Sequence, residues 1–207
     1  MTRIKICGIT NVKDALDAVA CGVDALGFVF ARSPRKISAQ RAAKIIEYLP
    51  PFVTKVGVFV NAEKKQVLRI LRACKLNALQ FHGDENDSYC SFFRKYCTII
   101  KAFRIKDKRS LDKVKEYRNA HAYLFDTYAE NRYGGTGRAF NYRMLAGRNF
   151  KKPVIIAGGI TKKNMPDIIC TIKPYAVDIS SGVETKPGKK NRRLMSSIVK
   201  TVKAVRV

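Results

Sequence analysis

Apolar residues along the chain fall into eight short runs, which are separated by segments with helical spacing. The runs cover residues 4–9, 24–30, 53–60, 78–83, 98–105, 122–128, 153–160 and 176–183. Their lengths are typical of buried strands. Between them, apolar residues recur every three or four positions, which predicts helices over residues 12–21, 39–49, 63–74, 88–96 and 110–117, and again after residue 191. Such an alternation implies parallel strands joined by crossover helices.

The number of units indicates how the sheet closes. Eight strand–helix units fill the 207 residues, so we expect a single α/β domain over residues 1–207 that folds as a (β/α)8 barrel, the TIM barrel. A doubly wound open sheet is the alternative, but the Gly-x-Gly-x-x-Gly fingerprint does not follow the first strand. In a barrel, the site is expected at the carboxyl ends of the strands.

Polar residues alternate with apolar residues near the ends of several predicted strands. Ile4 and Ile6 share one face of the first strand, which places Lys5 and Cys7 on the other. The face toward the helices must be apolar, so we expect the polar face to look into the barrel. By this parity the inward set is Lys5, Cys7, Gln80, His82, Lys101, Asp126, Asp178 and Ser180.

Structural roles stay open for single members of this set. Cys7 is by itself explained as a small buried apolar residue. His82 can be a core histidine, Asp178 can cap a loop, and Lys5 can pair with an acid inside the barrel. Asp126 precedes a loop with no evident need for a cap, which favours a functional role.

Glycine and serine clusters follow the last two predicted strands. Gly158 and Gly159 follow the seventh strand, and Ser180, Ser181 and Gly182 follow the eighth. Barrels often bind phosphate at this place through backbone amides and a helix N-terminus. Glycine pairs are common in turns, but both clusters together favour a phosphate site. A third cluster, at residues 133–137, could cover the mouth of the barrel.

The charge is strongly positive, with 41 Lys and Arg against 16 Asp and Glu, or +25. Such a balance attracts nucleic acid, anionic membrane or small phosphorylated substrates. The cations are spread over the predicted helices without an RNA-binding aromatic motif, which favours a solvated basic surface and no specific nucleic-acid or membrane partner. The six cysteines form no Cys-x-x-Cys or Cys/His cluster, so we expect reduced thiols and no metal site. Without an apolar span or signal-peptide layout, we expect a cytoplasmic location.

Several motifs, taken together, resemble the phosphoribosylanthranilate isomerase family of tryptophan biosynthesis. They are Lys-Ile-Cys-Gly-Ile-Thr at 5–10, Gly-Phe-Val-Phe at 27–30, Ser-Pro-Arg at 33–35, Val-Gly-Val-Phe at 56–59 with Asn61, Leu-Gln-Phe-His-Gly at 79–83, Asp126 with Gly-Gly-Thr-Gly at 134–137, Ala-Gly-Gly at 157–159 and Val-Asp-Ile-Ser-Ser-Gly-Val-Glu at 177–184. The match runs from the first predicted strand to the last.

This resemblance implies an Amadori rearrangement that needs no cofactor, with Asp126 as general acid and Cys7 as general base. It further implies that Arg35 binds the anthranilate carboxylate and that Gln80, His82 and Asp178 contact the substrate. The phosphate-binding residues would be Gly158, Gly159, Ser180, Ser181 and Gly182. We expect Lys5 to lower the pKa of the Cys7 thiol, and we expect a monomer or a homodimer.

Two other functions are weighed against this one. Another phosphate-binding barrel isomerase, acting on a ribulose phosphate or on the related histidine-pathway intermediate, would share the glycine clusters but would not be expected to set Cys7 opposite Asp126. A non-enzymatic polyanion-binding protein would explain the charge and leave the inward polar residues unexplained.

Overall fold

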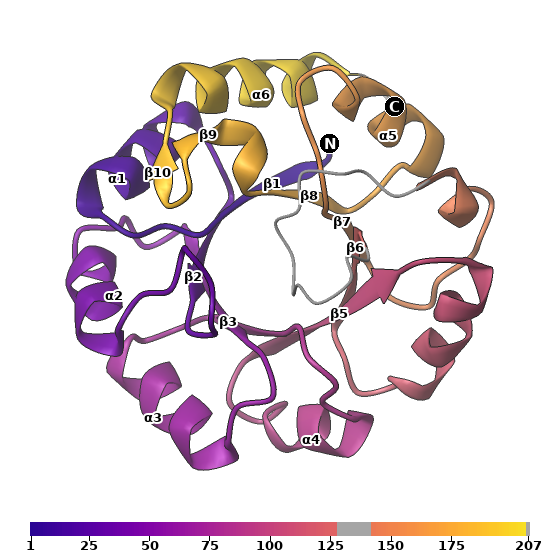
Figure 1. Ribbon diagram of the computed structural model, residues 1–207, viewed down its shortest axis with the longest axis horizontal. Helices are drawn as coiled ribbons and strands as arrows, with labels where there is room; N and C mark the ends of the chain where they lie inside the picture. Colours follow the sequence, from indigo (N-terminus) through magenta and orange to yellow (C-terminus); the bar gives the residue numbers. More distant parts are fainter. Residues whose placement is uncertain (128–141, 206–207) are drawn as a thin grey trace.

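The computed structural model of the chain describes residues 1–127 and 142–205. Eight parallel strands close into a barrel in chain order, and helices surround it (Figure 1). The strands are β1 (Arg3–Cys7), β2 (Ala25–Val29), β3 (Thr54–Phe59), β4 (Ala78–Phe81), β5 (Thr98–Ile105), β6 (Ala122–Thr127), β7 (Val154–Ile156) and β8 (Ala176–Ile179). The predicted (β/α)8 barrel is therefore confirmed.

Helices connect most of the strands. They are α1 (Val12–Cys21), α2 (Ala39–Ile46), α3 (Lys64–Ala73), α4 (Asp87–Phe92), α5 (Met165–Ile172) and α6 (Arg192–Ala204), with the 3-10 helices η1 (Lys108–Glu116), η2 (Tyr142–Leu145) and η3 (Ser181–Val183). The first of them shows why the boundaries fall where they do. Asn11 caps α1 by accepting from the backbone N–H of Asp14, and Gly22, with φ of 88°, ends the helix in the left-handed region.

The segment after β5 differs from its prediction. The sequence predicts an α-helix over 110–117, but the structure has the 3-10 helix η1 over Lys108–Glu116. Asp107 and Ser110 form a capping box at its start, and the buried residues Leu111 and Val114 lie three positions apart. A spacing of three matches the three residues per turn of a 3-10 helix. The two buried anchors at this spacing therefore suit the tighter helix that the structure has.

Two apolar layers hold the barrel together. A large cluster fills the space between strands and helices, and the residues of β1 that belong to it are Ile4 and Ile6. A smaller cluster fills the inside of the barrel with mostly small or branched side chains: Val56, Ala78, Ile100, Ala102, Ala122, Leu124, Ile155, Ala157 and Ala176. Because side chains alternate along a strand, the polar side chains near the ends of the inner face lie above this plug.

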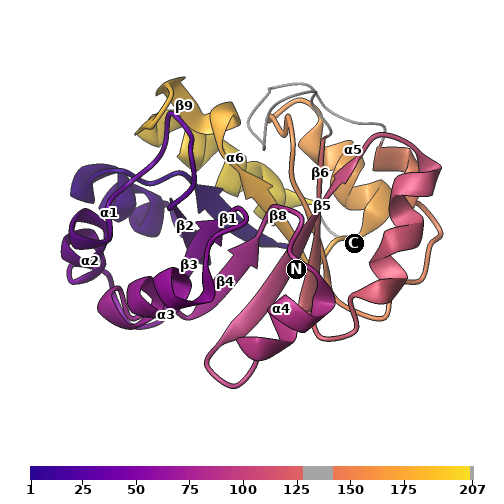
Figure 2. The ribbon, with the colours of Figure 1, turned by 60° about the horizontal axis from the view of Figure 1, so that its bottom comes forward.

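A short hairpin interrupts the alternation of strands and helices after β8. It consists of β9 (Glu184–Lys186) and β10 (Lys189–Lys190), which pair antiparallel. Figure 2 shows β9 beyond the end of the barrel at which the strands terminate. No helix within the described ranges is both long enough and apolar enough to cross a membrane.

Candidate active site

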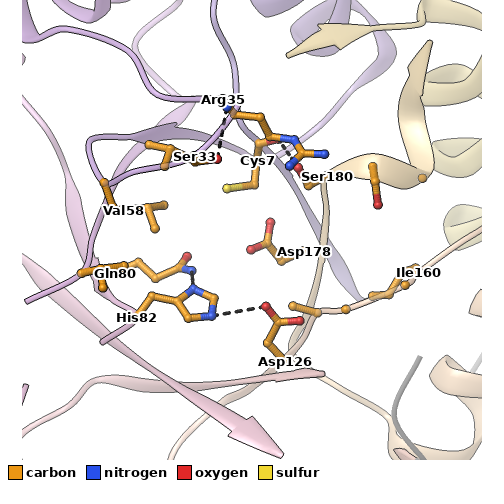
Figure 3. Close-up of a pocket in the computed structure, with 18 of the residues that line it drawn as sticks. Cys7, Ser33, Arg35, Val58, Gln80, His82, Asp126, Ile160, Asp178 and Ser180 are labelled. Atoms are coloured by element: carbon orange, nitrogen blue, oxygen red, sulfur yellow. Dashed lines mark hydrogen bonds and ion pairs between the residues drawn. The ribbon is translucent and has the colours of Figure 1, made fainter. Parts of the chain in front are cut away.

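A pocket opens at the carboxyl ends of the strands (Figure 3). Its walls include all eleven residues that the sequence predicts for the site, although they come from six separate segments of the chain: Cys7, Arg35, Gln80, His82, Asp126, Gly158, Gly159, Asp178, Ser180, Ser181 and Gly182. Other lining residues that the sequence analysis did not assign are Val29, Ala31, Arg32, Ser33, Val58, Val60, Ala157 and Ile160. The predicted loop at 133–137 lies outside the described residues.

An ion pair between β1 and β8 lies beneath Cys7. Lys5 and Asp178 are opposite each other in the ladder, and Lys5 Nζ lies 2.7 Å from Asp178 Oδ2, with side chains only 4% and 6% exposed. Gly27 on β2 leaves room for this arrangement, because a Cβ there would lie 2.8 Å from Cys7 Sγ and 3.1 Å from Lys5 Nζ. Lys5, Cys7 and Gly27 therefore pack closely together, and Cys7 is the member of this group that lines the pocket.

Burial and the neighbouring charges act on the Cys7 thiol in opposite directions. Burial raises the pKa of the Cys7 thiol, and Asp178 raises it further, while Lys5 and Lys190 lower it. Lys5 acts in the predicted direction, but burial prevails, so the pKa of Cys7 stands above its ordinary value. Burial also disfavours the Lys5 ammonium, but the attraction of Asp178 and Cys7 is stronger and raises the pKa of Lys5.

A chain of polar contacts crosses the opposite wall. Gln80 Nε2 lies 3.1 Å from His82 Nδ1, and His82 Nε2 lies 3.2 Å from Asp126 Oδ2 (Figure 3). The amide nitrogen of Gln80 donates only to a ring nitrogen without a proton, so the role of each ring nitrogen depends on the tautomer of His82. Although it lies close to Asp126 Oδ2, His82 Nε2 is buried and makes no hydrogen bond among the described residues. The Oε1 atom of Gln80 and the Oδ1 atom of Asp178 are buried without a hydrogen-bond partner among the described residues.

Arg35 reaches the pocket from the loop after β2. Gly8 makes room for it, because its φ of 83° is in the left-handed region and a Cβ there would lie 2.5 Å from Arg35 Cδ. The guanidinium donates to both oxygens of Glu184, from Nε at 2.9 and 3.1 Å and from Nη2 at 2.6 Å. These hydrogen bonds to Glu184 raise the pKa of Arg35. Arg35 thus holds a full charge at the edge of the pocket.

The predicted phosphate loops lie side by side. Gly158 and Gly159, with φ of 83° and 63°, turn the chain after β7 in conformations that favour glycine. Gly182 packs against this turn, because a Cβ there would lie 2.1 Å from the carbonyl oxygen of Ile160. Ser181 and Gly182 belong to η3. The two clusters therefore form one surface of small residues, where the backbone can approach an anion closely.

Two lysines do not fit the sequence analysis. Lys101 was expected inside the barrel, but its neighbours Ile100 and Ala102 occupy the inner face. Its side chain lies on the outer face, 3.0 Å from Glu85 Oε2, so that prediction is wrong. Lys190 was counted with the solvated basic residues, but its side chain is fully buried beside the site. Its only sequence signal is its place shortly after the motif at 177–184.

The fold and the pocket together define a class of protein. It is a (β/α)8-barrel enzyme with one cavity that contains a thiol, a carboxyl group and the surface of small residues where a phosphate is predicted to bind. No group of three His, Cys, Asp or Glu side chains suited to a metal ion occurs in residues 1–127 and 142–205. The comparisons with known proteins make this class specific. The family model described as N-(5'phosphoribosyl)anthranilate (PRA) isomerase matches residues 4–201.

Relatives and solved structures agree with the family model. The isomerase of Geobacter sulfurreducens is 46% identical over 204 residues, covering 98% of this chain and 99% of the relative. The crystal structure of phosphoribosyl anthranilate isomerase from Thermotoga maritima matches with a TM-score of 0.92 and 38% identity, covering 98% of this chain and 99% of that one. The chain belongs to the phosphoribosylanthranilate isomerase family and is an isomerase of tryptophan biosynthesis.

Proposed function

We propose that Cys7 is the general base and Asp126 the general acid of an Amadori rearrangement in this pocket. The substrate is N-(5-phosphoribosyl)anthranilate, and the product is 1-(2-carboxyphenylamino)-1-deoxyribulose 5-phosphate. The observation that carries the proposal is the placement of Cys7 and Asp126 on facing walls of one pocket, with the small-residue loops beside both (Figure 3). A solved isomerase, 37% identical with a TM-score of 0.85 and covering 98% of this chain and 99% of that one, is titled as a complex with the reduced product.

The chemistry assigns one proton transfer to each group. Asp126 donates a proton to the ribose ring oxygen, the bond from that oxygen to C1 breaks, and the anthranilate nitrogen forms a Schiff base with C1. Cys7, as thiolate, then removes the proton from C2, and the electron pair forms the C1–C2 double bond of an enolamine. Protonation at C1 and loss of the hydroxyl proton from C2 give the ketone. Protons and electrons balance without a cofactor.

The remaining residues of the pocket bind the substrate. Gly158, Gly159, Ser180, Ser181 and Gly182 surround the phosphate, and Arg35 takes the anthranilate carboxylate. Gln80 Oε1 and Asp178 Oδ1 are buried acceptors, which suit hydroxyl or amine hydrogens of the opened sugar. His82, whose Nε2 atom lies 3.2 Å from Asp126 Oδ2, orients the acid.

The state of assembly is proposed only as a monomer or a homodimer. One solved relative, from Thermotoga maritima, is titled as monomers generated from a dimeric isomerase. It is 35% identical with a TM-score of 0.88, covering 98% of this chain and 99% of that one.

Two substitutions test the acid and the base separately. Cys7→Ser replaces a thiol with an alcohol that is almost never ionised, and Asp126→Asn removes the transferable proton. Each should lower kcat by about a hundredfold or more, while KM stays within about tenfold because phosphate and carboxylate are bound elsewhere. The fluorescence of the anthranilate group, followed over time, gives both constants.

Matched controls use residues of the same type outside the pocket. Cys170→Ser and Asp112→Asn, both at exposed positions, should keep wild-type kcat. Retention of more than about a tenth of kcat by Cys7→Ser, against the loss expected for a positioned base, would show that Cys7 is not the base. His82 would then be the next candidate.

A further inference from the structure

A network of buried charges lies behind the wall of the pocket that Arg35 forms. Its members are Arg35, Glu184 and Lys190, with side chains 10%, 4% and 0% exposed. One carboxylate serves both cations: Glu184 Oε2 lies 2.6 Å from Arg35 Nη2, and Glu184 Oε1 lies 2.8 Å from Lys190 Nζ. Buried ion pairs are costly to desolvate and are often no more stabilising than apolar residues of the same volume. A network of three therefore calls for a role in the site.

Glu184 fixes the plane of the Arg35 guanidinium. It occupies the Nε–Nη2 edge with both of its oxygens, which is the bidentate geometry that holds a guanidinium in one orientation. The other edge, at Nη1, is the one that a substrate carboxylate would take. Without Glu184, the long Arg35 side chain could rotate its charge toward the neighbouring phosphate surface instead.

Lys190 connects the same network to the carboxyl end of β1. Its Nζ donates to the carbonyl oxygen of Cys7 and to that of Ser180, the latter at 3.3 Å. The Ser180 hydroxyl also donates to the Cys7 carbonyl, at 3.1 Å. Lys190 thereby ties together the strand end that carries the thiol and the loop that begins the phosphate surface.

The hairpin of β9 and β10 explains how these two charges come to be neighbours. Its register pairs Lys190 with Glu184 directly, and the backbone N–H of Gly188 in its turn donates to Glu184 Oε1 at 3.2 Å. The hairpin belongs to no strand–helix unit of the barrel. The buried side chains of the hairpin, Glu184 and Lys190, contact Arg35 and the Cys7 carbonyl, so the hairpin adds to the site and not to the barrel core.

From these contacts we infer that Glu184 and Lys190 are positioning residues for the isomerase reaction: Glu184 orients Arg35 toward the substrate carboxylate, and Lys190 holds the strand end that presents Cys7. The inference rests on the proposed function, because the acceptor at Nη1 is the anthranilate carboxylate. The inference adds that selectivity for a substrate with a carboxylate depends on Glu184, which does not itself touch the substrate.

The test of Glu184 compares two inhibitors with wild type and variants. One inhibitor is the reduced product, and the other is the same compound without its ring carboxylate. Wild type should prefer the first. Glu184→Gln should lose this preference by about tenfold or more, since a hydrogen bond to a charged group contributes that much to affinity, and it should bind the compound without the carboxylate as wild type does. Glu63→Gln, at an exposed N-cap without a side-chain hydrogen bond, is the matched control.

The outcomes separate the inference from the proposed function. A wild type without preference for the carboxylate would overturn the role of Arg35, and the inference with it. The inference alone would be overturned if wild type has the preference and Glu184→Gln either keeps it or binds both inhibitors more weakly by the same factor. If Glu184→Gln does not fold, Glu184→Asp serves in its place, because it keeps the charge but withdraws it from the guanidinium, and Arg35→Lys remains the positive control for a lost preference.

The test of Lys190 uses the pH profile of kcat. The charged groups facing the thiol are Lys5 from β1, Arg35 from the loop after β2, Asp178 from β8 and Lys190 from β10. Removing the cation in Lys190→Met should move the rising limb of the profile to higher pH, because Lys190 lowers the pKa of Cys7. Lys189→Met, its exposed neighbour on β10, should leave the limb in place. An unchanged limb together with an unchanged kcat in Lys190→Met would overturn the assignment of Lys190.

Discussion

Replacing Lys5 by Met removes one half of the buried ion pair beneath Cys7 and leaves Asp178 charged and unpaired. The pair has a distance of 2.7 Å and side chains 4% and 6% exposed. Breaking such a pair on one side costs about 3–5 kcal/mol. For a domain of this size each kcal/mol lowers Tm by about 2–4 °C, so Tm should fall by about 6–20 °C.

A surface pair provides the control. Lys13 Nζ lies 2.6 Å from Asp17 Oδ2, as close as the buried pair, but Lys13 is 80% exposed. Lys13→Met should cost no more than about 0.5 kcal/mol, because solvent screens such pairs and helix neighbours contribute little. The double variant Lys5→Met/Asp178→Asn should recover much of the loss, since neither buried charge remains.

Urea unfolding followed by circular dichroism, together with the Tm of each variant, measures these differences. The pKa of Lys5 is raised from 10.5 in the fold, so its stabilising contribution is complete below about that pH and disappears as pH rises through the higher pKa of the folded state. The contrast between variants is therefore fully present at pH 7. Equal losses for Lys5→Met and Lys13→Met, or no recovery in the double variant, would refute the reasoning.

Three other results are expected. Gly182→Ala should weaken phosphate binding, seen as a smaller rise of Tm with inorganic phosphate, because the added Cβ would lie 2.1 Å from the carbonyl of Ile160 and must push the loops apart; an unchanged rise would place the phosphate elsewhere. Iodoacetamide should modify Cys7 slowly at pH 7 and faster as pH rises, because burial raises the pKa of its thiol, whereas exposed Cys170 should react first in peptide mapping; fast labelling of Cys7 at neutral pH would contradict this. With a charge of +25, the protein should bind DNA or RNA weakly and without sequence preference, and fluorescence anisotropy should show the binding fade near physiological salt; tight, selective binding there would contradict a merely solvated basic surface.

The sequence by itself determined the barrel and the place of its site. Eight apolar runs that alternate with helical segments leave few topologies other than parallel strands with crossover helices. Strand parity correctly turned Lys5 and Asp178 inward, because side chains alternate strictly between the two faces of a strand. Glycines predicted the turns for an equally local reason. Gly8 and Gly158 have positive φ, which glycine adopts easily because it lacks a Cβ.

Only the tertiary structure decided which charges meet. The inward placement of Lys101 was wrong, because its neighbours Ile100 and Ala102 take the inner face and strict alternation turns Lys101 outward, where it meets Glu85. The partner of Arg35 is Glu184, 149 positions away in the chain, and the pKa of Cys7 is raised because burial prevails over two neighbouring cations. Local patterns fix the direction of a backbone, but burial and charge pairing depend on distances between segments remote in sequence, and these exist only after the barrel has closed.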